Sequence, residues 1–105
     1  MNGQEVPVAC DPTAIAATDR PRYSQLIKQL RSAVRDRHEL SDGFVYELDS
    51  KAIALTEVAE WITLERLCCP FLTFNLQVAG GGDPRLTLRG PDGVKAILQE
   101  EFPRK

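Results

Sequence analysis

The spacing of hydrophobic residues along the chain predicts three helices. Apolar side chains recur every three or four positions over 20–38, 51–69 and 92–102, a period that places them on one face of a helix. Asp19 is a candidate N-cap for the first range, and Pro21 falls in its first turn, where proline is tolerated. We expect this first helix to bury one stripe of side chains, formed by Tyr23, Leu26, Ile27, Leu30 and Val34.

Alternation of apolar and polar residues predicts three strands, over 44–48, 71–78 and 85–89. The glycine-rich stretch 80–84 separates the last two, which favours an antiparallel hairpin with a loop at its tip. The resulting order, α-β-α-β-β-α, predicts an α+β fold with a small, mostly antiparallel three-stranded sheet and helices packed on one face. A ferredoxin-like half-fold shares the β-α-β-β-α part of this order.

The length predicts one domain. A chain of 105 residues is expected to build one modest core, so we assign 1–105 to a single domain. Residues 1–19 have little periodicity, and Pro7 and Pro12 argue against a helix there. This segment is therefore predicted to be an N-terminal arm, extended in part and pinned to the domain.

Composition and charge narrow the classes of function. The formal net charge is −2, with 13 basic and 15 acidic residues interspersed, whereas nucleic-acid binding usually requires a basic surplus. No apolar run approaches the ~20 residues of a membrane helix, and the first residues lack the features of a signal peptide. We expect no nucleic-acid or membrane partner, and a cytoplasmic location with reduced thiols.

The candidate chemistry is concentrated at the end of the second predicted helix. Two of the three cysteines, Cys68 and Cys69, are adjacent and directly precede Pro70. On a helical wheel of about 100° per residue, both thiols fall within the apolar arc, and Glu65 falls in its middle, one turn earlier. A carboxylate at that position is costly to bury unless it is paired or bound, and Arg66 and Arg89 are candidate ion-pair partners.

Thiolates are soft ligands suited to Zn(II), Cu(I) or Hg(II). Adjacent residues of a helix point about 100° apart, so Cys68 and Cys69 could reach one ion only if the helix unwinds before Pro70. Cys10 could be folded over them by the arm. Three thiolates, or two with Glu65, would then form a soft-metal site.

Two other interpretations of the cysteine pair stay open. In one, a thiol of low pKa acts as a redox sensor or in a thiol enzyme. In the other, both cysteines are buried packing in a structural or interaction domain. His38, the single histidine, lies in a charged run and is expected at the surface.

The segment from Glu65 to Phe71 resembles a group of small bacterial proteins with the motif E-R-x-C-C-x-F, followed by a hairpin and a G-P-x-G helix start, here Gly90 to Gly93. A similar segment is appended to some mercury-responsive, MerR-like regulators. The resemblance implies an association with heavy metals through Cys10, Cys68 and Cys69, with Glu65 as the acidic partner. The leading hypothesis is therefore a non-enzymatic domain that binds a thiophilic metal ion for heavy-metal handling or sensing.

Overall fold

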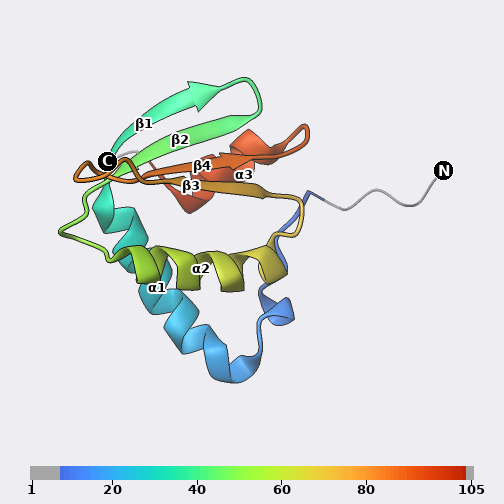
Figure 1. The fold of residues 1–105 in the computed structure, drawn as a ribbon. Helices are drawn as coiled ribbons and strands as arrows, with labels where there is room; N and C mark the ends of the chain where they lie inside the picture. The colour runs from blue at the N-terminus through green and yellow to red at the C-terminus, as the bar shows by residue number, and fades with distance from the viewer. Residues whose placement is uncertain (1–7, 104–105) are drawn as a thin grey trace.

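Two β-hairpins form one four-stranded sheet in the computed structural model, which describes residues 8–103 (Figure 1). The first hairpin consists of β1 (Val34–Leu40) and β2 (Gly43–Leu48), and the second of β3 (Thr73–Gln77) and β4 (Arg85–Arg89). The strand order is β1-β2-β4-β3, and every neighbouring pair is antiparallel. The pairing of β2 with β4 therefore joins the two hairpins into one surface.

Three helices cover one face of this sheet: α1 (Arg20–Ala33), α2 (Leu55–Cys68) and α3 (Val94–Glu101). Alternate residues of β2 and β4 point into the core between sheet and helices, while the residues between them on the other face, such as Val45 and Thr87, are only partly buried. Trp61 of α2 is fully buried and packs edge-on against Phe74 of β3 and Phe102, with ring centroids 6.0 Å apart in both cases. These aromatic contacts fix α2 under the sheet.

The first predicted helix was too long, and the strand that follows it was missed. The helix ends at Ala33 instead of residue 38, where the chain turns into β1. This strand has no alternating apolar pattern because it lies at the sheet edge and carries charges on both faces. Charged residues on an edge strand discourage pairing with another chain, but they remove the periodicity that identifies a strand.

The α+β class, the mostly antiparallel sheet and the packing of helices on one face agree with the sequence prediction. The sheet has four strands instead of three, and the order along the chain is α-β-β-α-β-β-α. The half-fold order expected from the ferredoxin-like comparison therefore lacks β1. The hairpin predicted from 71–78 and 85–89 is confirmed, although its first strand covers only Thr73–Gln77. The burial of Phe44, Tyr46 and Leu48 on one face is also confirmed.

The N-terminal arm is more ordered than its composition indicated. Two short 3-10 turns, η1 (Pro12–Ala14) and η2 (Ala17–Asp19), precede α1, and Ile15 between them is fully buried in the core. Residues 1–7 lie outside the described part of the chain, so the predicted extended segment is seen only from Val8 onward. No helix within residues 8–103 has the length and hydropathy that crossing a bilayer requires.

Candidate functional site

The end of α2 places two sulfur atoms side by side. Cys68 is the last helical residue, and Cys69 leaves the helix with φ −125° and ψ 71° while its N–H still donates to the carbonyl of Glu65 at 2.7 Å. Proline disfavours helical geometry in the residue before it, so Pro70 accounts for this exit. The Sγ atoms of Cys68 and Cys69 are 3.7 Å apart. The unwinding that the sequence analysis required for convergence is present.

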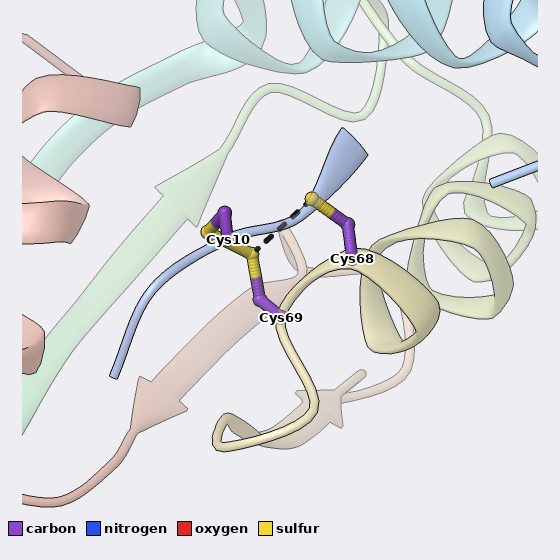
Figure 2. A group of neighbouring side chains, drawn as sticks. All are labelled: Cys10, Cys68 and Cys69. Carbon is purple, nitrogen blue, oxygen red and sulfur yellow. Dashed lines mark hydrogen bonds between the residues drawn. A yellow bond between two sulfur atoms is a disulfide. The ribbon is translucent and has the colours of Figure 1, made fainter. Parts of the chain in front are cut away.

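The arm brings the third cysteine to the same point (Figure 2). Cys10 and Cys69 form a disulfide with Cα atoms 4.7 Å apart, and Cys68 remains a free, buried thiol beside it. The Sγ atoms of the three cysteines all lie within 4.8 Å of one another. The thiols were expected to be reduced, but the structure contains one disulfide and one free thiol. Cys10 does lie close to Cys68 and Cys69, as the arm was expected to allow.

The position of Cys10 does not depend on the disulfide alone. The N–H of Asp11 donates to the carbonyl of Cys68 at 2.9 Å, and the side chain of Ile15 is completely buried four residues later. A backbone hydrogen bond on one side and an apolar anchor on the other hold this part of the arm against the end of α2. Reduction of the disulfide would leave both contacts in place.

Glu65 is fully buried, as its position on the helical wheel predicted. Its partner is not an arginine: the hydroxyl of Tyr23, on α1, donates to Glu65 Oε1 at 2.6 Å. The predicted ion pairs are wrong because Arg66 is exposed on the other side of α2 and Arg89 pairs with Asp42 at 2.9 Å. A neutral donor satisfies one oxygen of this carboxylate and leaves its charge uncompensated.

Glu101, which was not among the predicted site residues, lies on α3 and faces Glu65. Glu65 Oε2 and Glu101 Oε1 are buried without a hydrogen-bond donor among the described residues, since two carboxylates can only accept. A proton on Glu101 removes this conflict. Burial, followed by the hydrogen bond to Glu65 and its negative charge, raises the pKa of Glu101 to about 10. The pair therefore holds a proton at neutral pH.

A signal for Glu101 was present in the sequence. It follows Leu98 by three positions and Val94 by seven, so it extends the apolar stripe of the last helix. The same criterion singled out Glu65. Applied to both helices, it would have found the two carboxyl groups that the tertiary structure brings together.

The electrostatics of this cluster, formed by Cys10, Cys68, Cys69, Glu65 and Glu101, are acidic. Burial, and then the negative charges of Glu65 and Glu101, raise the pKa of the Cys68 thiol to about 11. The charge of Arg31 lowers the pKa of Glu101, but burial and the effects of Glu65 are larger and act in the opposite direction. Cys68 is therefore a protonated, weakly nucleophilic thiol at neutral pH.

Two sets of potential metal ligands overlap in the cluster. One is the three-cysteine set, and the other consists of Glu65, Cys69 and Glu101, each with ligand atoms within 4.8 Å of one another. Cys69 belongs to both. A metal ion placed among them could take three sulfur donors from the first set, or one sulfur and two carboxylate oxygens from the second, which are donor sets for soft and borderline metals respectively.

A third such group lies on the open face of the sheet, where His38 Nε2 is 2.6 Å from Glu47 Oε2 and 3.7 Å from Asp36 Oδ2. The side chain of His38 is 52% exposed, which agrees with its predicted surface position. These three residues are explained by an exposed charge network, and they add nothing to the buried cluster.

No protein-family model, no curated protein and no solved structure matches this chain. The geometry of the cluster therefore carries the functional conclusion.

Proposed function

We propose that the reduced protein binds a thiophilic metal ion through Cys10, Cys68 and Cys69, as a binding protein for heavy-metal handling or sensing. The observation that carries this proposal is the convergence of three sulfur atoms, from two distant parts of the chain, within 4.8 Å of one another in a buried site. Glu65 is the oxygen ligand or the charge that tunes the site.

The spacing of the sulfurs fits a single ion. Two thiolates bound to one metal at about 2.3 Å are ~3.8–4.0 Å apart in tetrahedral or trigonal geometry. The Sγ atoms of Cys68 and Cys69 are already 3.7 Å apart. Cys10 and Cys69 are bonded to each other, so reduction has to separate their sulfurs before both can bind one ion. The contacts of Asp11 and Ile15 keep Cys10 close to the site after reduction.

The charge distribution also favours a cation. The Cys68 thiol, whose pKa is raised, lies beside the carboxyl groups of Glu65 and Glu101, and its ionisation without a bound cation would add negative charge to a region of low dielectric. A metal ion reverses this effect by stabilising the thiolates. Binding is therefore expected to release protons from the thiols, and more of them at low pH than at high pH.

The ligand set separates the candidate metals. Three thiolates without an oxygen suit Cu(I) or Hg(II), whereas Zn(II) is most often four-coordinate and would recruit Glu65 as the fourth ligand. Glu65→Gln is therefore expected to weaken Zn(II) binding strongly and Hg(II) binding little. The tyrosine hydroxyl that contacts Glu65 can donate to a glutamine oxygen as well, so the variant keeps that hydrogen bond.

Titration of the reduced protein under anaerobic conditions tests the proposal. Hg(II), Zn(II) and Cu(I) are added with a competing chelator of known affinity, and thiolate-to-metal absorption is recorded. We expect one equivalent to bind, and Cys68→Ser to lower the affinity at least tenfold. Leu67→Ser, at an exposed neighbouring position, is the matched control and should bind as the wild type does. Equal uptake by Cys68→Ser and wild type would refute the proposal.

A thiol redox switch is the second candidate function, and the Cys10–Cys69 disulfide favours it. Forming this bond oxidises two thiols, releases two protons and passes two electrons to an oxidant such as a disulfide of low molecular mass. It would also remove two of the three metal ligands. The raised pKa of Cys68 argues against a thiol enzyme in which Cys68 is the nucleophile, because the thiolate is the reactive form.

Equilibration with reduced and oxidised glutathione distinguishes the switch from a permanent disulfide. Free thiols are counted after unfolding in the presence of a maleimide reagent. A switch is expected to interconvert between one and three free thiols within the range of cellular glutathione potentials. If one free thiol is counted under all of these conditions, the disulfide is a permanent structural bond. That result would exclude both the switch and metal binding by three thiolates under the same conditions.

A further inference from the structure

A pocket with no part in the proposed metal site lies where the end of α1, the first hairpin and the residues after α3 meet. It has a volume of about 410 Å³, within the ~300–1,000 Å³ range of small-molecule sites. Its lining comes from the end of α1, the start of β1, the middle of β2 and the residues after α3: Arg31, Val34, Arg35, Asp36, Arg37, Tyr46, Phe102 and Pro103. No residue of the cysteine cluster takes part.

Positive charge is concentrated in this lining, with three arginines and one acid. Arg35 is engaged by Asp83, but Arg31 and Arg37 make no ion pair within residues 8–103. Arg31 uses only its Nε, which donates to the carbonyl of Glu101 at 2.6 Å. The terminal nitrogens of two guanidinium groups therefore remain available to a ligand.

The strand register explains why Arg37 reaches the pocket. Arg37 is paired with Tyr46 across β1 and β2, so both side chains leave the sheet on the helix side. Its guanidinium lies over the ring of Phe44, with Cζ 4.7 Å from the centroid. Stacking on an aromatic ring orients the planar group without using its hydrogen-bond donors.

Tyr46 supplies a second, independent observation. Its side chain is completely buried, and its hydroxyl has no hydrogen-bond partner in the described part of the chain. A buried hydroxyl without a partner costs free energy, whereas phenylalanine would pack in the same place without that cost. Burial raises the pKa of Tyr46, so the group is a neutral O–H donor.

We infer that this pocket binds a small organic anion, a carboxylate or a phosphate monoester with a flat apolar body. Guanidinium groups match the geometry of both oxyanions, and the Tyr46 hydroxyl adds a neutral donor. Val34, Phe102 and Pro103 provide the apolar surface on which the body of the ligand would lie. The site is separate from the proposed metal function and does not depend on it.

Titration of the full chain with benzoate and phenyl phosphate, followed by NMR of the backbone amides, tests this inference. Benzamide and inorganic phosphate are the matched probes, since one lacks the charge and the other lacks the apolar body. We expect both aryl anions to shift the amides around Arg37 and Tyr46, and both matched probes to bind at least tenfold more weakly. Equal binding of benzamide would overturn the assignment of an anion site.

Tyr46→Phe is the decisive variant because it separates binding from folding. The hydroxyl has no partner, so the variant should unfold at the same or a higher urea concentration, yet bind phenyl phosphate about tenfold more weakly. Arg37→Gln should weaken binding by at least as much, whereas Arg66→Gln, an equal change of charge at an exposed site on α2, should bind within twofold of wild type. Unchanged affinity in Tyr46→Phe and Arg37→Gln would overturn the inference.

Discussion

Reduction of the disulfide should destabilise the protein, and a thiophilic metal should restore the lost stability. Cys10 and Cys69 are 59 positions apart in the sequence. A cross-link that closes a loop of this length lowers the entropy of the unfolded chain by an amount worth about 4 kcal/mol at 25 °C in the chain-entropy model. The native contacts of Asp11 and Ile15 survive reduction, so the loss arises mainly in the unfolded state.

A metal bound to all three thiolates closes the same loop. Because the unfolded chain does not present these ligands together, a metal at 100 times its dissociation constant stabilises the native state by about 2.7 kcal/mol. The oxidised form should therefore be the most stable and the reduced metal-free form the least stable. The reduced metal-bound form should be intermediate, with a free energy of unfolding that rises as the free metal concentration increases.

Urea unfolding followed by the fluorescence of Trp61, the single tryptophan and a fully buried one, measures all three states. With an m-value of ~1–2 kcal/mol/M for a small domain, a loss of 4 kcal/mol lowers the midpoint by roughly 2 M or more. Cys68→Ser is the control, because it retains the disulfide but lacks one metal ligand. It should lose the rescue by metal and keep the effect of reduction. Coincident unfolding curves for the oxidised and reduced wild type would refute the reasoning.

Three further predictions concern the groups around the cluster and the sheet. Tyr23→Phe removes the donor to Glu65, so the free energy of unfolding should fall by about 1.5–3 kcal/mol in urea experiments; an unchanged midpoint would contradict the assigned hydrogen bond. Because the pKa of Glu101 is raised to about 10, the native state keeps a proton that the unfolded chain releases above its usual carboxyl pKa, and stability should decline from pH 5.5 to pH 8.5 by at most ~1.4 kcal/mol per unit. Glu101→Gln should flatten this decline, and an identical slope would exclude Glu101 as its source. Gly43→Ala would push a Cβ into a backbone carbonyl of β4 and should lower the melting temperature by several degrees, whereas Gly80→Ala, in open space, should leave it nearly unchanged.

Much of the site could be predicted from local pattern. Glu65 is conspicuous in the sequence because it interrupts an apolar helical stripe, and the structure buries it completely. Cys68 and Cys69 are conspicuous because they are adjacent before Pro70, and their sulfurs do converge. Periodicity reports which face of an element is buried, and this is why the burial of each of these residues could be predicted.

The partners of these residues could not be predicted in the same way. Arg66 and Arg89 were the expected partners of Glu65, whereas the structure supplies Tyr23 from α1 and Glu101 from α3. Which side chain faces a buried carboxylate depends on how helices pack, and helix packing is decided by contacts between residues far apart in the sequence. Edge strand β1 was also missed because it depends on a contact with another segment. It has no buried apolar face, and its backbone hydrogen bonds to β2 hold it in the sheet.

The sequence by itself determined the inward face of the helices and of the strands with alternating apolar residues, because periods of two and 3.6 residues encode that face. It also indicated that the second helix ends before Pro70, because proline disfavours helical geometry in the residue that precedes it. Only the tertiary structure decided that Cys10 joins Cys69, that two carboxyl groups share a proton, and that Arg37 and Tyr46 meet in a pocket. These contacts join residues that are far apart in the sequence. The entropic cost of closing the loops between them is offset only when the whole core forms.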